Sequence, residues 1–453
     1  MTASCHGTTT GTPGECFAEK RTVNIGIIGF GDMGRLYAQK FIEAGWQHVN
    51  VCDLPAKYDA LREELADSPI RVFRDGHAVS RRSDFIIYSV EAERINAVVA
   101  LYAPSTKMGA IVAGQTSVKA PEVRAFEEHM PEDVNIVTCH SLHGPKIDPT
   151  GQPLVIVRHR STEDKYHLTV RILSSLGSEH VFLSYEEHDR ITADTQAVTH
   201  VAFLSMGTAW KTQRVFPWED RNYVGGIENV KVNMALRIYG SKWHVYAGLA
   251  ILNPSARIQV RQYALSVSEL FALMIQERKE EFRARILRAA DYVFGQAGEQ
   301  RQRSRKILLS DEVLDRFSLS SVPKEKRKPN SHLSLLAIVD CWHALRINPY
   351  DHLICQTPPF RLWVGIVEYL FNDAEMLEST INAALYDMDT RGEDLHFYSA
   401  AQGWAQCIEI GSMEGYQLRF QDTSSFFQDR LADAGKLSSE MIATITRHIH
   451  QTD

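Results

Sequence analysis

The sequence predicts an α/β domain built on a parallel sheet, followed by a largely helical region. Up to about Arg160, short apolar runs alternate with amphipathic stretches, which is the pattern of strands joined by crossover helices. From about Tyr185 onward, long helical patterns replace this alternation. At 453 residues the chain is too long for a single hydrophobic core, so two or three domains are expected.

Apolar runs in the first part are expected to be strands, and the amphipathic stretches between them are expected to be helices. The expected strands are residues 23–28, 48–52, 70–73, 85–90, 110–114, 134–139 and 153–158. The expected helices are residues 32–44, 56–66, 92–102 and 119–129. In such a doubly wound sheet, helices cover both faces and ligands bind beyond the carboxyl ends of the strands. The segments 89–91, 114–119 and 140–146 are therefore the first candidates for function.

Three glycines follow the first expected strand at the spacing of a nucleotide-binding turn. Gly29 permits a tight turn, Gly31 lets the backbone approach a pyrophosphate, and Gly34 lets the next helix pack close to the strand. The start of that helix offers unpaired N–H groups to phosphates. This order predicts a dinucleotide-binding Rossmann unit, and the alternative is a glycine-rich turn in an ordinary α/β sheet. The expected cofactor contacts are Gly29, Phe30, Gly31, Asp32, Met33, Gly34, Asp53, Ser89 and Val90.

The residue that ends the second apolar run bears on which cofactor is bound. Asp53 follows the glycine turn at the end of this run, and an acid there usually pairs with the ribose hydroxyls of NAD and repels the 2′-phosphate of NADP. Lys57 and Arg62 follow closely and could offset the charge of that phosphate. These residues alone leave the choice between NAD and NADP open.

Composition and charge argue against several classes of protein. The net charge of −7 argues against general nucleic-acid binding, and no apolar run approaches the roughly 20 residues of a membrane helix. The first residues are polar and lack the apolar centre of a secretory signal, so residues 1–21 are expected to be a disordered lead. Seven cysteines without paired spacing fit a reducing compartment, and no cluster has zinc spacing. The sequence therefore predicts a cytoplasmic protein without a structural metal.

The remaining chain is expected to be helical in two parts. The Rossmann unit spans residues 22–185, and a helical substrate and dimerisation domain spans 186–295. Within that domain, helical patterns cover residues 186–214, 227–240, 242–252, 254–277 and 278–295. The basic and polar residues 296–330 are expected to form a linker, and residues 331–453 a helical extension.

The helical extension resembles the first helical domain in sequence. The number of residues between His200 and Trp210 is the same as that between His332 and Trp342. A proline also follows each histidine, at the same spacing along the sequence in both cases. We predict an internal duplication, with chance similarity of apolar helices as the alternative. Two copies could pack together as the subunits of a dimer do, so the protein is expected to be a homodimer or an intramolecular pseudo-dimer.

Three residues beyond expected strand ends could carry chemistry beside a nicotinamide. His140 follows a strand directly and can accept a proton near neutral pH. Ser117 could bind a substrate hydroxyl, and Lys119 could supply positive charge. Each has a structural alternative, namely a loop histidine bonded to backbone, a helix cap and a solvated lysine.

Two further polar residues stand among apolar neighbours in the first helical domain. Arg237 needs a partner if it is buried, and that partner is either a structural carboxylate or a carboxylate of the substrate. His200 is flanked by apolar residues, so a satisfied core histidine is the simpler interpretation.

Together these segments resemble prephenate dehydrogenases, and in length and in the residues of these segments the chain is most similar to the fungal members. The matching motifs are Ser117-Val118-Lys119, His140 to Gly144, His188-Asp189 and Thr199-His200. Ser141 stands where the family has proline, and Phe203 stands where some bacterial members have another histidine. The resemblance covers about residues 22–295.

The resemblance implies oxidative decarboxylation of prephenate to 4-hydroxyphenylpyruvate on the route to tyrosine. It also implies a 6-phosphogluconate-dehydrogenase-like helical domain and, for fungal members, NADP as cofactor. His140 would accept the proton of the ring hydroxyl, Ser117 would orient that hydroxyl, and Arg237 would bind the ring carboxylate. The other implied substrate contacts are Lys119, Thr199, His200 and Tyr246, the last matching an aromatic that bacterial dimers lend across their interface.

Other functions stay open on the residues alone. They are an arogenate dehydrogenase, another hydroxyacid dehydrogenase of the same architecture, and a non-catalytic NADP-binding regulator. In the second helical copy, the position of Arg237 falls near Val367, so that copy is expected to lack a working site.

Overall fold

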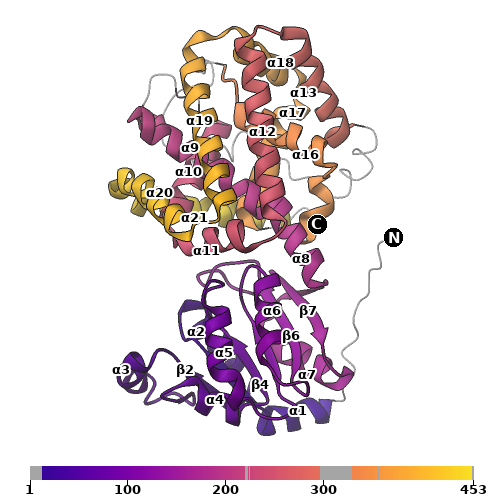
Figure 1. Cartoon of the computed structure of the whole chain (residues 1–453), viewed down its shortest axis with the longest axis vertical. Coiled ribbons are helices and arrows are strands. Elements are labelled where there is room, and N and C mark those ends of the chain that lie inside the picture. The colour runs from indigo at the N-terminus through magenta and orange to yellow at the C-terminus, as the bar shows by residue number, and fades with distance from the viewer. Residues whose placement is uncertain (1–12, 220–222, 224, 296–328, 356, 451–453) are drawn as a thin grey trace. The chain divides into compact units, whose positions relative to one another are not determined.

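The computed structural model describes residues 13–219, 223, 225–295, 329–355 and 357–450 (Figure 1). The chain divides into two compact units between Asp189 and Arg190. The first unit contains a sheet and helices, and the described part of the second is helical. No described helix is both long enough and apolar enough to cross a bilayer.

An eight-stranded sheet forms the centre of the first unit. Its strands are β1 (Asn24–Ile28), β2 (His48–Cys52), β3 (Arg71–Val72), β4 (Phe85–Tyr88), β5 (Ile111–Gly114), β6 (Asn135–Ser141), β7 (Pro153–Arg160) and β8 (Glu179–Phe182). They lie in the order β3-β2-β1-β4-β5-β6-β7-β8, which begins with the strand order of a Rossmann fold. The predicted Rossmann sheet is therefore confirmed.

One strand departs from the prediction of a fully parallel sheet. Neighbouring strands are parallel except for β6 and β7, which pair antiparallel. The connection between these two strands contains no helix, and a parallel return would need a longer crossover. The strand β8 was not predicted, because it buries only Val181 among its four residues.

Helices cover both faces of the sheet, as a doubly wound fold requires. They are α1 (Pro13–Thr22), α2 (Asp32–Glu43), α3 (Tyr58–Glu64), α4 (Gly76–Arg82), α5 (Ile95–Tyr102), α6 (Ala120–His129) and α7 (Glu163–Leu173). One face of the sheet packs against Tyr37 of α2 and Ile172 of α7. The other face packs against Val99 of α5 and Phe126 of α6. The helices α4 and α7 were not predicted from the sequence.

The expected disordered lead, residues 1–21, is corrected by helix α1. Residues 1–12 lie outside the described part of the chain, but Pro13–Thr22 is helical. The carboxylate of Glu19 pairs with Arg171 of α7 at 2.6 Å, and the carbonyl oxygen of Lys20 accepts a hydrogen bond from the backbone N–H of Gln47. These partners are distant in sequence, so the polar composition of the segment gave no sign of them.

The second unit is a helical assembly with one shared core. Its helices are the end of α8 (Tyr185–Thr192), α9 (Val198–Gln213), α10 (Ile227–Tyr239), α11 (Trp243–Ala247), α12 (Ala256–Ile275), α13 (Lys279–Phe294), α16 (Leu333–Leu345), α17 (Pro358–Asn372), α18 (Ala374–Tyr386), α19 (Met388–Ile410), α20 (Met413–Phe426) and α21 (Gln428–His450). Two π-helical segments, Ala193–Ala197 and Gly248–Leu252, interrupt them. One hydrophobic core extends from Val198 to Ile442, so the regions 186–295 and 331–453 share it. Most of the predicted linker, residues 296–328, lies outside the described residues.

The helix boundaries of the second unit repeat at a constant distance along the chain. We call the separation of His200 and His332 in the sequence the repeat distance. The ends of α9 and α16 are separated by this distance, and so are the starts of α12 and α19. Arg214 and Arg346, which terminate α9 and α16, are also one repeat distance apart and have similar left-handed φ values of 57° and 59°. The correspondence seen around two histidines in the sequence thus extends over whole helices.

The packing of these helices is reciprocal. Helix α9 packs on α19, while α12, the counterpart of α19, packs on α16, the counterpart of α9. The helices α12 and α19 also pack on each other. A two-fold relation requires this pattern, because element i of one copy must contact element j of the other and the reverse. We call α9–α13 the first copy and α16–α20 the second copy.

Candidate active site

The predicted nucleotide-binding turn joins β1 to α2 in the first unit. Gly29 has a φ of +95°, and a Cβ atom there would collide with the carbonyl oxygen of Ser89. A Cβ atom at Gly34 would collide with the carbonyl oxygen of Gly29. At Gly31 the position of a Cβ has no atom within 4 Å, so the backbone is open on that side. The turn is therefore tight where it packs and open where a pyrophosphate would approach.

The other predicted cofactor residues gather around this turn. Gly31 precedes the first residue of α2 without a side-chain cap, which leaves first-turn N–H groups available to an anion. Asp32 is exposed, Met33 is half-buried and Phe30 is buried in the sheet core. Val90, after β4, lies 3.0 Å from the Cβ position of Gly29. The geometry fits the pyrophosphate of a dinucleotide.

The acid at the end of β2 is paired with a cation. Asp53 accepts hydrogen bonds from the backbone N–H of Leu54 at 2.7 Å and from Nζ of Lys57 at 3.2 Å. Arg62 is exposed on α3. Because Lys57 balances the charge of Asp53, this edge of the site repels a phosphate less than an unpaired carboxylate would.

Two histidines and an aspartate form a hydrogen-bonded chain in the first unit. His140 lies at the carboxyl end of β6, and its Nδ1 is 2.8 Å from Nε2 of His188. The other ring nitrogen of His188, Nδ1, is 2.8 Å from Oδ1 of Asp189. The Asp189 carboxylate also accepts hydrogen bonds from the backbone N–H groups of Lys119 and Ala120, both at 2.7 Å. We call His140, His188 and Asp189 the relay.

The relay determines which nitrogen of His140 can accept a proton. Since a carboxylate only accepts, Nδ1 of His188 carries a hydrogen and Nε2 of His188 is an acceptor. Nδ1 of His140 then donates to it, which leaves a lone pair on Nε2 of His140. Burial and the neighbouring His188 hold the pKa of His140 well below the ordinary value for histidine. His140 is therefore a neutral base with one defined accepting atom.

Lys119 has a different role from the predicted substrate contact. Its side chain is fully buried, and its Nζ lies 2.7 Å from both Oε1 of Glu122 and the carbonyl oxygen of Cys139, with Oγ1 of Thr138 at 3.3 Å. These acceptors use all three donors of the ammonium group. Lys119 therefore ties the start of α6 to β6 and positions His140, which corrects the prediction. Ser117 lies two residues earlier in the same turn and is half-buried.

His200 is buried against an aromatic ring in the second unit. Its ring centroid lies 4.7 Å from that of Tyr246, with the two rings nearly perpendicular. Burial lowers the pKa of His200 to about 3. Among the described residues, neither Nδ1 of His200 nor Oγ1 of Thr199 has a hydrogen-bond partner. His200 is therefore a buried histidine whose Nδ1 the described residues do not satisfy, unlike the satisfied core histidine considered from the sequence.

Arg237 lies half-buried in α10 of the same unit. Its Nη1 donates to Oγ of Ser439 at 3.0 Å, and no described carboxylate lies within ion-pair distance of it. Burial lowers the pKa of the guanidinium, and the neighbouring Tyr246 opposes this. The structural carboxylate considered from the sequence is absent from the described residues, so the guanidinium is available to an anion.

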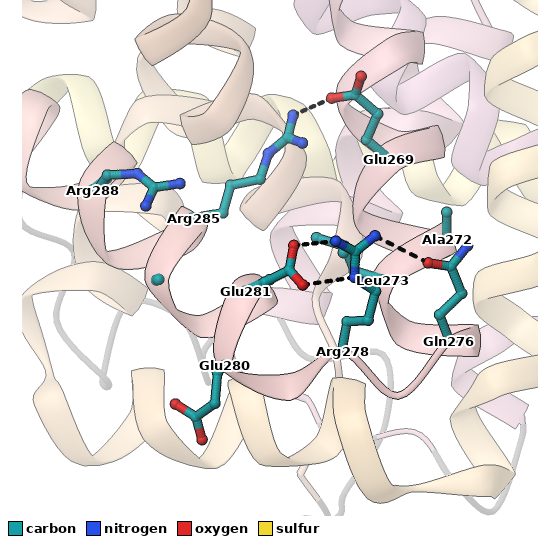
Figure 2. Close-up of a pocket in the computed structure, with 10 residues that line it drawn as sticks. Glu269, Ala272, Leu273, Gln276, Arg278, Glu280, Glu281, Arg285 and Arg288 are labelled. Atoms are coloured by element: carbon teal, nitrogen blue, oxygen red, sulfur yellow. Dashed lines mark hydrogen bonds and ion pairs between the residues drawn. The ribbon is translucent and has the colours of Figure 1, made fainter.

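A surface hollow of about 610 Å³ lies between α12 and α13 of the second unit (Figure 2). Two of its arginines already bind side chains of the protein. Figure 2 shows Arg278 directed at Glu281 and Gln276, and Arg285 directed at Glu269. Most charges of the hollow are therefore paired, and none of the predicted site residues lines it, so it is not the candidate site.

Comparison with known proteins identifies the family. Residues 197–447 match a family described as a "6-phosphogluconate dehydrogenase C-terminal domain", and residues 24–113 match "NADP oxidoreductase coenzyme F420-dependent". A Schizosaccharomyces pombe protein named "Probable prephenate dehydrogenase [NADP(+)]" is 51% identical, over 95% of this chain and 100% of its own. The chain belongs to the prephenate dehydrogenase family. A Saccharomyces cerevisiae protein named "Prephenate dehydrogenase [NADP(+)]" is 50% identical, over 95% of each chain.

Among solved structures, a prephenate dehydrogenase from Aquifex aeolicus in complex with hydroxyphenyl propionate and NAD+ is similar over 58% of this chain and 94% of that one. The sequence identity is 16% and the TM-score is 0.48.

Sequence reasoning missed the roles of several residues of this prephenate dehydrogenase family member. His188 and Asp189 were recognised as a motif, but their link to His140 depends on how the first unit folds. Glu122, the partner of Lys119, lies three residues beyond it, and a lysine and a glutamate at that spacing can pair on a helix. Gln196 lies one helical turn before His200 and was not considered.

Proposed function

We propose that this protein is an enzyme of tyrosine biosynthesis. It oxidatively decarboxylates prephenate to 4-hydroxyphenylpyruvate and transfers the hydride to NADP. The observation that carries the proposal is the relay, because it presents Nε2 of His140 as a neutral proton acceptor beside the carboxyl ends of the Rossmann strands. The two fungal relatives named for this activity match nearly the whole chain.

In this reaction His140 removes the proton of the ring hydroxyl. Nε2 of His140 accepts that proton as hydride leaves the same carbon, and Ser117 orients the hydroxyl. When NADP+ is bound, its nicotinamide supplies the hydride acceptor, and the open backbone at Gly31 would hold its pyrophosphate. Asp189 stabilises the positive charge that develops on the two imidazoles of the relay.

The helical unit supplies the groups that bind the substrate's charged and polar parts. Arg237 binds the ring carboxylate, which leaves as carbon dioxide once the hydride has gone. Formation of the aromatic ring makes this loss favourable, so the protein needs mainly to orient the substrate and place charge. Thr199, His200 and Tyr246 contact the rest of the substrate. His200 is neutral because burial lowers its pKa to about 3.

NADP is the cofactor of this enzyme. The pairing of Lys57 with Asp53 supports this choice, because it removes the unpaired acid that would repel the 2′-phosphate. The names of both fungal relatives also specify NADP(+). The presence of Asp53 is thus compatible with a phosphorylated ribose.

An assay with two substrates and two cofactors tests the function. The reduction of NADP and of NAD is followed with prephenate and, separately, with arogenate, the amino analogue. We expect turnover with prephenate and NADP to exceed the other three combinations. Turnover confined to arogenate, or cofactor binding without turnover of either acid, would overturn the proposal.

We also infer that the second unit is an internal duplication, which acts as a pseudo-dimer. The constant repeat distance and the reciprocal packing of the two copies support this. Shifting Arg237 by the repeat distance leads to Tyr369 rather than the expected Val367, and neither residue is a cation. The second copy would then replace the second subunit, so sedimentation at micromolar concentration should give one chain. A tight dimer joined through residues 186–295 of both chains would contradict it.

We propose a cytoplasmic location. The described cysteines, Cys52, Cys139, Cys341 and Cys407, are free, which fits a reducing compartment. Fractionation of cells should find the protein with soluble cytoplasmic enzymes.

A further inference from the structure

Three polar side-chain atoms of residues 196–200 in the second unit are buried without partners. They are Nε2 of Gln196, Oγ1 of Thr199 and Nδ1 of His200. The three residues are only 6%, 1% and 9% exposed, and none of these atoms has a hydrogen-bond partner among the described residues. Buried polar groups in proteins are almost always hydrogen-bonded, so three neighbouring exceptions require an explanation.

The spacing of the three residues places them together. Gln196 precedes Thr199 by three residues and His200 by four, so the side chains project from one face of the helix. Gln196 belongs to the π-helical segment Ala193–Ala197, and such segments occur often at functional sites. Asp194 of the same segment also has a buried atom without a partner, Oδ1, while its Oδ2 lies 3.4 Å from Nε2 of His352.

All three atoms can donate a hydrogen bond to a ligand. The amide nitrogen of Gln196 only donates, the hydroxyl of Thr199 can donate, and a neutral imidazole carries one N–H that the unpartnered Nδ1 can hold. A set of neutral donors matches the oxygens of a 2-oxo acid, which only accept. It matches the ammonium group of a 2-amino acid less well, because that group only donates.

We propose that Gln196 is a specificity-determining residue, whose amide N–H donates to the keto oxygen of the substrate's 2-oxo acid side chain. Thr199 and His200 complete this donor set, and Arg237 serves the ring carboxylate separately. The proposal rests on the proposed function, because prephenate carries its 2-oxo acid on the side chain. It adds a residue that no motif in the sequence had marked.

The reaction product allows the side-chain contact to be tested without turnover. 4-Hydroxyphenylpyruvate has lost the ring carboxylate, so its binding does not need Arg237. 3-(4-Hydroxyphenyl)propionate has the same ring and carboxylate but lacks the keto oxygen. Both ligands are titrated against the full chain by calorimetry without substrate, for the wild type, Gln196→Leu and Gln402→Leu. Gln402 is the matched control, because its Nε2 donates to the carbonyl oxygen of Ala264 at 2.7 Å.

We expect the wild type to bind the pyruvate about tenfold more tightly than the propionate, from one net hydrogen bond. Gln196→Leu should abolish that preference while its melting temperature without ligand stays equal or rises, because an unpaired polar atom has been removed. Gln402→Leu should keep the preference and lower the melting temperature. A Gln196→Leu protein that retains the full preference would overturn the inference, and so would one that unfolds at lower temperature with ligand discrimination intact. Absence of prephenate turnover in the wild type would instead count against the proposed function.

Discussion

His200 and His332 lie one repeat distance apart in the helical unit, but their surroundings differ. His200 lies inside a helix that continues from a π-helical segment, and its neighbour is the ring of Tyr246. His332 directly precedes α16 and has a left-handed φ of 43°, and its Nδ1 lies 2.9 Å from Oε1 of Glu228. Lys231 also contacts Glu228, at 2.6 Å. The first copy thus leaves its histidine open, while the second binds its histidine to charges of the protein.

The difference shows how one arrangement of helices can have two roles. Although burial opposes ionisation of Glu228, the charges of Lys231 and His332 lower its pKa to about 2. These three groups satisfy one another, so they hold α10 to the second copy and leave no charge for a ligand. In the first copy, the polar atoms near His200 have no such partners in the described residues. We therefore expect ligand binding to depend on the groups around His200 and stability to depend on the charge cluster around His332.

The largest effect should come from the relay. It lies in the first unit, and the described part of the second copy has no counterpart of it. His140→Asn removes the proton acceptor but keeps a side chain of similar size. Because a positioned base contributes about 10²–10⁴-fold, kcat should fall within that range while the KM for prephenate stays nearly unchanged. Steady-state kinetics at saturating NADP would measure this. Full turnover in the variant would remove His140 as the base.

The next largest effect should be on stability, in the charge cluster through which Glu228 and Lys231 of α10 bind His332. Lys231→Met leaves Glu228 buried with only His332 as a partner, so the free energy of unfolding should fall by about 3–5 kcal/mol. Urea denaturation would measure the loss. Adding Glu228→Leu to this variant should restore part of it, because the unpaired charge is then gone. A raised KM for prephenate in the folded variant would show that this charge cluster takes part in binding, contrary to the comparison.

Arg237→Ala tests whether the open charge of the first copy serves the substrate. A hydrogen bond to a charged group contributes about 1.5–3 kcal/mol, so the KM for prephenate should rise by roughly 10-fold to 100-fold. Binding of 4-hydroxyphenylpyruvate should change little, since that molecule lacks the ring carboxylate. Arg237→Lys keeps the charge and should recover part of the affinity. Equal losses for both ligands would return Arg237 to a structural role.

The pH dependence distinguishes a buried base from an ordinary histidine. Because burial and His188 lower the pKa of His140, its neutral form persists as the pH falls through 6.5. The kcat/KM for prephenate should therefore stay level from pH 7 to pH 5.5, whereas a base with the ordinary pKa of about 6.5 would lose about tenfold of its neutral form. Initial rates across this range would show which applies. A fall that begins near pH 6.5 would mean that the site is more solvated than the relay implies.

The sequence was sufficient for the Rossmann sheet, because its glycine turn and apolar runs are local signals. It also predicts that His200 and His332 are equivalent, since their distances to tryptophan and proline are preserved. It could not show the relay or the buried pair of Lys119 and Glu122, because these contacts join strands and helices that only the folded unit brings together. It also could not separate an open histidine from an ion-paired one, because Glu228 lies far from His332 in the sequence. Local pattern predicts the elements, whereas the partner of a buried polar atom depends on packing.

The smallest effect should come from an ion pair that is exposed to solvent, in contrast to the buried groups of the relay and of the charge cluster around His332. Lys57 is 59% exposed where it meets Asp53, so water screens the pair and its loss should barely change the stability. The 2′-phosphate of NADP would nevertheless meet an unpaired Asp53 in Lys57→Ala. The preference for NADP over NAD, as the ratio of kcat/KM values, should fall by about fivefold. Asp53→Asn in the same background should restore most of it, because it removes the repulsion without replacing the cation. If Lys57→Ala leaves the ratio unchanged, another residue recognises the phosphate and the pair is only a surface contact.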